Sequence, residues 1–227
     1  MRIAEIFSSL QGEGMLAGVP SVFVRTSGCN LRCAWCDTPY TSWQPEGADR
    51  GVEEIVEEVR SRPARHVVVT GGEPMISPGI VALTHGIREA GRHITVETAG
   101  TVFEPVACDL MSISPKLSNS TPRERDGGRW AARHDRLRYQ PAVLRRLMEA
   151  YQYQLKFVVA DPGDLAEIHA MLDELGADRS RVCLMPEGTN PEALFRRGRW
   201  LWEVCVKEGL RYSPRLHVDL FGDRRGV

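Results

Sequence analysis

The most constraining feature of the sequence is a repeated alternation of short apolar runs with amphipathic helical segments. The run at 19–26 is rich in β-branched residues, as expected of a buried strand. The segment 52–62 places valine and isoleucine on one face and glutamates on the other, which is typical of an amphipathic helix. Because strands that alternate with helices usually pair in parallel, the chain is expected to adopt an α/β fold.

The same alternation continues to the end of the chain. We expect further strands at 66–70, 93–100, 108–116, 154–159, 181–188 and 215–221, and helices at 78–90, 141–151, 162–175 and 193–208. About six strand–helix units are too few to close an eight-stranded barrel. We therefore predict a single domain over residues 1–227, an open partial barrel of about six (β/α) units.

One segment, 117–138, breaks the pattern. It is rich in serine, arginine, aspartate and glycine and has no clear period, so we expect an irregular surface insertion, either a lid or a solvated loop. Its cationic residues are Arg123, Arg125, Arg129, Arg133, Arg136 and Arg138.

Composition limits the compartment and the partners. The formal net charge of −1 argues against bulk binding of nucleic acid, and no apolar run is long enough to cross a membrane. The first residues lack the apolar core of a signal peptide, so we expect a cytoplasmic protein. Thiols stay reduced there, and clustered cysteines then indicate a metal site or catalysis rather than disulfides.

Half of the six cysteines lie within eight positions, as Cys29, Cys33 and Cys36 in the spacing C-x3-C-x2-C. A structural zinc site needs four ligands, and iron–sulfur clusters are usually held by four cysteines. Three thiolates would leave one iron open for chemistry. A zinc site completed by a distant residue and three unrelated thiols remain the alternatives. The other cysteines, Cys108, Cys183 and Cys205, lie in apolar segments and are expected to be inert.

The remaining candidate motifs all follow predicted strands. They are Gly71-Gly72-Glu73-Pro74, Thr98-Ala99-Gly100-Thr101, Ser114-Pro115-Lys116 and Pro186-Glu187-Gly188. In parallel α/β architectures the functional site lies at the carboxyl ends of the strands, so we expect these loops to share one rim with the cysteine segment.

Two of these motifs together resemble the radical S-adenosylmethionine superfamily. The cysteine segment carries an aromatic residue, Trp35, before its last cysteine, and the Gly-Gly-Glu-Pro segment follows the next strand. The resemblance implies a [4Fe-4S] cluster held by Cys29, Cys33 and Cys36, with the amino and carboxylate groups of S-adenosylmethionine on its open iron.

Within that superfamily, "IFSSLQGEGMLAGVPSVFVRTSGCNLRCAWCDTPY" resembles the 7-carboxy-7-deazaguanine synthase family almost position by position. The stretches "VETAGT", "SPKLSNS" and "LHVDLFGDRRGV" extend the likeness over nearly the whole chain. It implies a lyase that converts 6-carboxy-5,6,7,8-tetrahydropterin to 7-carboxy-7-deazaguanine with release of ammonia, in queuosine and deazapurine biosynthesis, a tRNA modification pathway. One departure is Ala99, where the family commonly has asparagine.

The resemblance also implies site residues. S-adenosylmethionine contacts are expected at Trp35, Cys36, Asp37, Gly72, Ser114, Lys116 and Gln154, and substrate contacts at Leu10, Gln11, Gly12, Arg25 and Thr70. Thr38 is expected to contact Mg²⁺, which needs few protein ligands when the substrate supplies oxygens. The resemblance implies no catalytic side chain beyond the cofactors. Glu73 is expected to shape its loop. For Glu97 two positions stay open, one facing the ribose of S-adenosylmethionine and one facing the substrate.

The residue types suit these roles. Glycines flank Glu13 in "LQGEG", which lets the backbone approach a flat ring closely. Arg25 can pair bidentately with a substrate carboxylate. We expect the final strand to direct His217 to the rim, and the tail 222–227, with Arg224 and Arg225, to fold back over the pocket.

The resemblance further implies a flavodoxin-like electron donor and a homodimer, with no direct contact to nucleic acid or membrane. Two other functions stay open at this stage. A glycyl-radical-activating enzyme would need a protein partner rather than a pterin pocket, and "LQGEG" argues against it. A non-enzymatic zinc-binding module would contain no iron.

Overall fold

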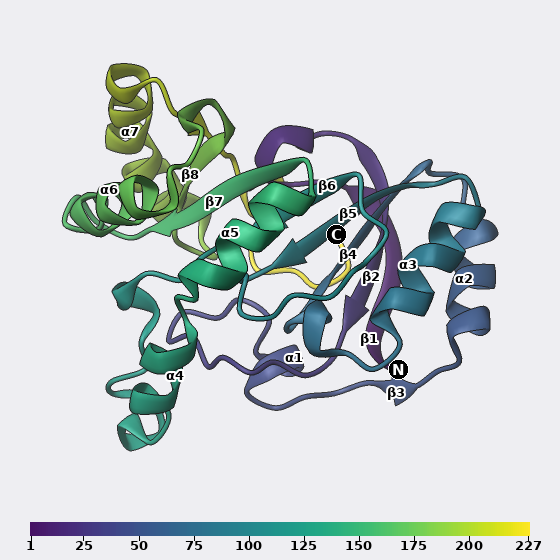
Figure 1. Cartoon of the computed structure of the whole chain (residues 1–227). Coiled ribbons are helices and arrows are strands. Elements are labelled where there is room, and N and C mark those ends of the chain that lie inside the picture. The colour runs from purple at the N-terminus through teal and green to yellow at the C-terminus, as the bar shows by residue number, and fades with distance from the viewer.

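The computed structural model describes all 227 residues and contains one nine-stranded sheet, in the order β3-β1-β2-β4-β5-β6-β7-β8-β9 (Figure 1). β1 (Arg2–Leu10) pairs antiparallel with β2 (Pro20–Thr26) and β3 (Ala48–Asp49). From β2 onward all neighbours are parallel: β4 (His66–Gly71), β5 (His93–Thr98), β6 (Leu110–Ile113), β7 (Tyr153–Val159), β8 (Val182–Pro186) and β9 (Arg211–Tyr212).

The helices connect these parallel strands and cover the outer face of the sheet (Figure 1). They are α2 (Val52–Arg60), α3 (Ile80–Glu89), α5 (Pro141–Ala150), α6 (Asp164–Leu175) and α7 (Pro191–Glu208), with a short α1 (Pro39–Ser42) after the cysteine segment. The apolar faces of helices such as α2, with Ile55 and Val59 fully buried, form the core against the strands. Because β3 and β9 are unpaired edges, the sheet is open, and the predicted α/β fold with an unclosed barrel is confirmed.

The expectation of a final strand at 215–221 is wrong, because this segment forms the helix α8 (Leu216–Phe221). The alternation of Leu216, Val218 and Leu220 suggested a strand, yet only Val218 is buried and Leu220 is 70% exposed. β9 ends at Tyr212, and the chain then turns inward, where the Leu216 N–H donates to the Gly12 carbonyl at 3.0 Å. This turn removes the segment from the sheet edge, and a helix satisfies its backbone locally.

The insertion 117–138 is more ordered than expected. It contains α4 (Ala131–Leu137) and two short 3-10 turns, Ser118–Ser120 and Arg125–Gly128. Buried His134 anchors α4, since its Nε2 lies 2.8 Å from the Ser120 hydroxyl. No helix of the structure is both long and apolar enough to cross a membrane.

Candidate active site

A cavity of about 420 Å³ opens at the carboxyl ends of β2, β4, β5 and β6, where the sequence motifs were expected to meet. The C-terminal segment passes across the mouth of the sheet near β4 and β5 (Figure 1). The predicted residues that line the cavity are Leu10, Gln11, Gly12, Arg25, Trp35, Asp37, Thr38, Thr70, Gly72, Ser114 and Lys116. Cys29, Cys33, Cys36 and Gln154 do not line it.

The three cysteines lie beside the cavity in the loop between β2 and α1, here called the cysteine loop (27–38). The Leu31 N–H donates to Cys29 Sγ at 3.3 Å, and Cys36 Sγ lies 3.2 Å from the Ser42 hydroxyl. The three thiols do not converge with other ligands on one point that could hold a single ion. A cluster does not require such convergence, since each thiolate binds a different iron. The loop therefore fits an iron–sulfur cluster better than one zinc ion.

Burial raises the pKa of the Cys29 and Cys33 thiols to about 12. Thiols in such surroundings are protonated at neutral pH unless a metal displaces the proton. The cysteine loop is thus suited to bind metal and poorly suited to act as a free nucleophile.

The Gly-Gly-Glu-Pro segment packs directly against the cysteine loop. The Glu73 N–H donates to the Gly28 carbonyl at 2.9 Å, and a Cβ on Gly72 would lie only 2.1 Å from that carbonyl oxygen. Glu73 itself is fully buried and accepts hydrogen bonds from the Thr98 hydroxyl and the Ala99 N–H, both at 2.8 Å. Glycine at 72 and glutamate at 73 hold the ends of β2, β4 and β5 together.

The residues expected around S-adenosylmethionine gather in the cysteine loop and at the ends of β4 and β6, with one exception. Lys116 Nζ donates to the Ser114 hydroxyl at 2.9 Å and lies 5.6 Å from the Trp35 ring centroid. Gln154 instead faces the protein interior. It accepts from the Met15 N–H and donates to the Ser112 hydroxyl, both at 2.7 Å, and so supports the "LQGEG" turn from behind.

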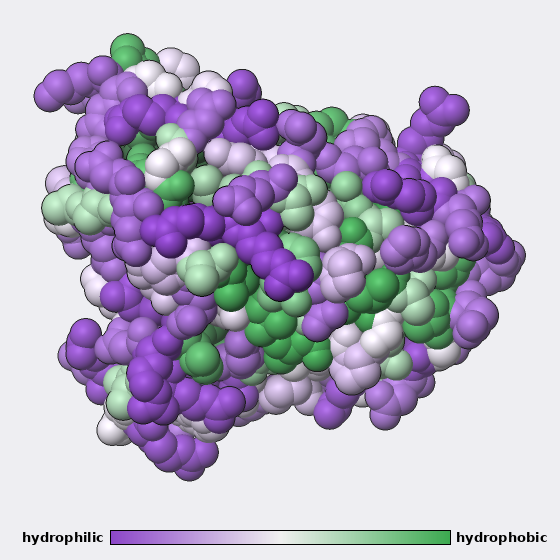
Figure 2. Space-filling model, viewed as in Figure 1, coloured by the Kyte–Doolittle hydropathy of each residue, from purple (hydrophilic) through white to green (hydrophobic).

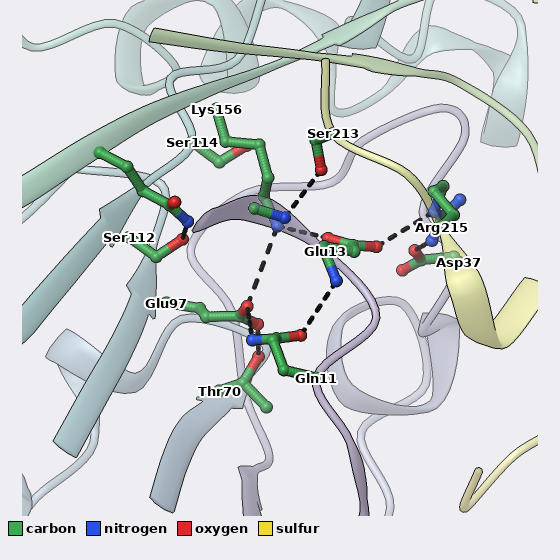
Figure 3. A network of polar contacts seen from close by, with 12 residues as sticks. Gln11, Glu13, Asp37, Thr70, Glu97, Ser112, Ser114, Lys156, Ser213 and Arg215 are labelled. Carbon is green, nitrogen blue, oxygen red and sulfur yellow. Dashed lines mark hydrogen bonds and ion pairs between the residues drawn. The ribbon is translucent and has the colours of Figure 1, made fainter. Parts of the chain in front are cut away.

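A network of charged and polar side chains forms the wall of the cavity that faces away from these cofactor residues, here called the network wall (Figure 3). Glu97 accepts from the Thr70 hydroxyl at 2.7 Å and from Gln11 Nε2 at 3.2 Å. Its Oε1 lies 3.8 Å from Nζ of Lys156, which also forms an ion pair with Glu13. Glu97 therefore faces the same side of the cavity as the predicted substrate residues Gln11 and Thr70.

The network continues from Glu13 to the C-terminal region. Arg215 Nε lies 3.0 Å from Glu13 Oε1, and the same guanidinium pairs with Asp37 of the cysteine loop. His217 also lines the cavity, with Nε2 3.9 Å from Glu13 Oε1. A Cβ on Gly12 would meet His217 Nδ1 at 2.2 Å, so glycine is required there for this close approach.

The C-terminal tail lines the cavity over Gly222–Val227, as expected from the sequence. Glu5 anchors it, since its carboxylate lies 3.1 Å from Arg225 Nε. The same carboxylate accepts from Arg25 Nε at 2.7 Å and from the Tyr40 hydroxyl at 2.8 Å. Arg25 is thus held at the cavity wall by Glu5 on the neighbouring strand.

Comparison with known proteins agrees with this geometry. The radical SAM superfamily model matches residues 23–116. The 7-carboxy-7-deazaguanine synthase of Halobacterium salinarum is 49% identical over 97% of this chain and 90% of its own, and that of Rhodopirellula baltica is 45% identical over 99% and 88%.

The chain belongs to the 7-carboxy-7-deazaguanine synthase family.

The fold agrees with this family as well. The crystal structure of QueE from Escherichia coli superposes with a TM-score of 0.71 at 28% identity, covering 95% of this chain and 94% of that one. The protein is accordingly a radical SAM enzyme, a class that uses a [4Fe-4S] cluster and S-adenosylmethionine. The zinc module and the glycyl-radical-activating enzyme are thereby set aside.

Two residues of this family member were missed at the sequence level. Lys156 and Arg215 are each 5% exposed and both contact Glu13. A signal for Lys156 was present, because a lysine within the apolar run "YQLKFVV" needs a buried partner. Arg215 offered no comparable signal, since it lies at the start of the segment 215–221, which is expected from the sequence to be the final strand.

The two buried cations set the charge state of Glu13. Burial by itself would raise the pKa of this carboxyl group, but the Lys156 ammonium and the Arg215 guanidinium outweigh it and hold the pKa well below its usual range. Glu13 is therefore a carboxylate at all physiological pH values and can accept hydrogen bonds from a substrate.

Proposed function

We propose that this protein converts 6-carboxy-5,6,7,8-tetrahydropterin to 7-carboxy-7-deazaguanine with release of ammonia, on the route to queuosine. The observation that carries the proposal is the meeting of the cysteine loop, the Gly-Gly-Glu-Pro segment and the charged network around one cavity. When bound, the cluster and S-adenosylmethionine supply the hydrogen-atom abstraction that starts the rearrangement. The chain itself binds the substrate, orients it and excludes water.

The network wall is assigned to the substrate. Glu97 and Glu13 are oriented acceptors for the N–H groups of a pterin edge, and the backbone at Gln11 and Gly12 can approach the flat ring closely. Thr70 positions Glu97, and Leu10 adds an apolar contact. Because these groups are held by ion pairs before the substrate arrives, little reorganisation is needed on binding.

Two arginine side chains are assigned to bind the carboxylate of the substrate. Arg25 and Arg225 both reach the cavity and share Glu5 as their partner. Glu5 is the carboxylate that both guanidinium groups share, and Arg225 pairs in addition with the exposed Glu46. A substrate carboxylate between the two guanidinium groups would accept charge-assisted hydrogen bonds from both.

The wall of the cavity across from the network wall is assigned to the cofactors. Cys29, Cys33 and Cys36 would hold the cluster, and Trp35, Gly72, Ser114 and Lys116 would contact S-adenosylmethionine. Thr38 would bind Mg²⁺, with Asp37 beside it held by Arg215. Gln154 would act on the site through the "LQGEG" turn rather than by contact.

The decisive experiment is anaerobic incubation of the cluster-loaded protein with S-adenosylmethionine, dithionite and the carboxypterin. We expect 7-carboxy-7-deazaguanine and ammonia, detected by mass spectrometry and an ammonia assay. Cys33→Ala is the negative control, since it removes a cluster ligand. Cleavage of S-adenosylmethionine without any deazaguanine product would contradict the proposal and indicate another substrate.

The proposal extends to assembly and location. Residues 1–227 would act as a single domain, since one sheet spans the chain. The exposed side chains of Leu220 and Phe221 adjoin one apolar groove, and we assign them to the interface of a homodimer. Light scattering of Phe221→Asp against the unmodified protein tests this. The enzyme would reside in the cytoplasm and receive electrons from a flavodoxin-like protein.

A further inference from the structure

The sulfur atoms of the cysteine loop differ in the groups that approach them. Cys36 Sγ lies 3.2 Å from the hydroxyl of Ser42, which is the last residue of α1. Cys29 Sγ accepts instead from a backbone group, the Leu31 N–H, at 3.3 Å. The Thr38 hydroxyl lies further from Cys36 Sγ, at 3.9 Å. Ser42 therefore places a side-chain hydroxyl at close hydrogen-bond distance from one of the three cluster ligands.

The Ser42 hydroxyl has no other partner in the chain. The residue is only 3% exposed, so bulk water does not replace a missing contact, and Cys36 Sγ is the one atom with which this hydroxyl hydrogen-bonds. Buried hydroxyl groups in folded proteins are nearly all hydrogen-bonded. A thiolate that binds iron has no proton and can only accept, which makes the Ser42 hydroxyl the donor in the cluster-loaded protein.

The residues on either side of Ser42 are themselves fixed to the cysteine loop. The Gly28 N–H donates to the Thr41 carbonyl at 2.8 Å. Trp43 Nε1 donates to the Cys33 carbonyl at 3.0 Å. These contacts hold Ser42 in place without using its hydroxyl, so the hydrogen bond to the sulfur needs little reorganisation.

The insertion 117–138 covers this part of the loop from outside. Arg125 Nη1 donates to the Ala34 carbonyl at 3.0 Å, and its guanidinium lies 4.0 Å from the centroid of the Trp43 ring, directly after Ser42. None of residues 117–138 lines the cavity, and hydrophilic residues dominate the outer surface around α4, at the lower left of Figure 2. The insertion is therefore a cover of the cysteine loop rather than a lid on the cavity. A hydrogen bond shielded from water in this way is stronger than one in solvent.

We propose that the Ser42 hydroxyl raises the reduction potential of the cluster by donating a hydrogen bond to the Cys36 thiolate. Reduction adds one electron, and part of its charge resides on the ligand sulfurs, so a donor directed at one sulfur stabilises the reduced form more than the oxidised form. Ser42 keeps its proton throughout. It does not line the cavity, so it acts on the reaction through Cys36 alone, as a positioning residue. The inference rests on the proposed function, which assigns the cluster to this loop.

The test compares Ser42→Ala, which removes the donor, with Ser42→Thr, which keeps a hydroxyl, in the cluster-loaded protein. The matched control is Ser21→Ala at the far end of β2, a serine that is 2% exposed and donates to the Val19 carbonyl at 3.0 Å. Each protein is titrated anaerobically with titanium(III) citrate and redox mediators, without S-adenosylmethionine or pterin. The EPR signal of the reduced cluster gives the midpoint potential. Because only bound clusters contribute to the signal, the midpoint does not depend on how many molecules carry one.

We expect Ser42→Ala to lower the one-electron reduction equilibrium constant by about three- to tenfold, which is about 30–60 mV at about 59 mV per tenfold change. Ser42→Thr and Ser21→Ala should keep the midpoint of the unmodified protein. An unchanged midpoint in Ser42→Ala would overturn the inference. So would an equal shift in Ser42→Thr or in Ser21→Ala, since the cause would then be packing rather than the hydroxyl.

The titration also separates this inference from the proposed reaction. A shifted midpoint in Ser42→Ala, together with no deazaguanine from the unmodified protein, would support the role of Ser42 and count only against the proposed substrate. Normal deazaguanine formation with equal midpoints in all four proteins would overturn the role of Ser42 alone. An unmodified protein that binds no cluster would contradict both.

Discussion

Arg215 and Glu13 are 202 positions apart in the sequence, and their side chains meet at 3.0 Å at the edge of the cavity. The same guanidinium pairs with Asp37, next to a cluster ligand. Arg215 thus links the turn after β1, the cysteine loop and the C-terminal region. Removing one partner of a buried ion pair leaves an uncompensated charge, which makes this residue a sensitive site for substitution.

Arg215→Met should destabilise the protein by about 3 kcal/mol, because Glu13 loses one of its two buried cations and Asp37 loses its ion-pair partner. Urea denaturation measures the change. The control Arg211→Met removes an exposed arginine four positions away and should shift stability by less than about 0.5 kcal/mol. Equal stability of the two variants would mean that the Arg215 contacts contribute nothing net.

The low pKa of Glu13 predicts a specific acid sensitivity. A carboxyl group whose pKa is lower in the folded than in the unfolded state stabilises the fold above its unfolded pKa of about 4.3, and this stability is lost as pH falls further. The free energy of unfolding should therefore decline more steeply below that pH in the unmodified protein than in Glu13→Gln. The measurement is urea denaturation of both proteins at a series of pH values between neutral pH and about 3.5. If the free energy of unfolding fell with the same slope against pH in both proteins, Glu13 would not be the group responsible.

Cys33→Ala should abolish the cluster's absorbance and turnover, because the loop then has only two thiolates for three irons. Cys108→Ala should change neither, since Cys108 Sγ donates to the Ile94 carbonyl at 3.7 Å and the residue packs against the core, outside the cysteine loop. Iron and acid-labile sulfide analysis of the two anaerobically reconstituted variants is the measurement. Full activity after loss of Cys33 would contradict the assignment of the cluster.

Thr38→Ala should retain the cluster and the cleavage of S-adenosylmethionine but weaken the magnesium dependence of turnover. The hydroxyl lines the cavity beside Asp37, where the substrate can supply the remaining oxygens. Turnover is measured across a magnesium titration, with Thr41→Ala as a buried control on α1. An unchanged magnesium response in the Thr38 variant would exclude it as the ligand.

Deletion of Gly222–Val227 should raise the KM for the pterin far more than it lowers stability, because Arg225 leaves the cavity wall while the core is untouched. Arg225→Ala should reproduce part of the effect, and Arg224→Ala, whose side chain has no ion-pair partner in the structure, should have a smaller one. Steady-state kinetics decides, and an unchanged KM in the truncated protein would show that the tail has no part in binding.

Much of the fold was predictable because its signals are local. Period-two and amphipathic patterns located nearly every parallel strand and its helix, from β2 to α7. The prediction failed at Leu216–Phe221, where an alternating pattern forms a helix because the preceding turn leads the chain away from the sheet. It also missed α4, since burial of a single residue, His134, anchors that helix.

The sequence by itself determined the chemistry of the cysteine loop, because the three thiols and Trp35 lie within one short segment and need no distant residue to be recognised. Only the tertiary structure decided what surrounds it. Lys156 and Glu13, 143 positions apart, form a buried pair, and the insertion 117–138 covers the cysteine loop, where Arg125 donates to the Ala34 carbonyl 91 positions away in the sequence. The physical reason is that ion pairs and packing depend on distances in space, which local patterns of residue type do not encode.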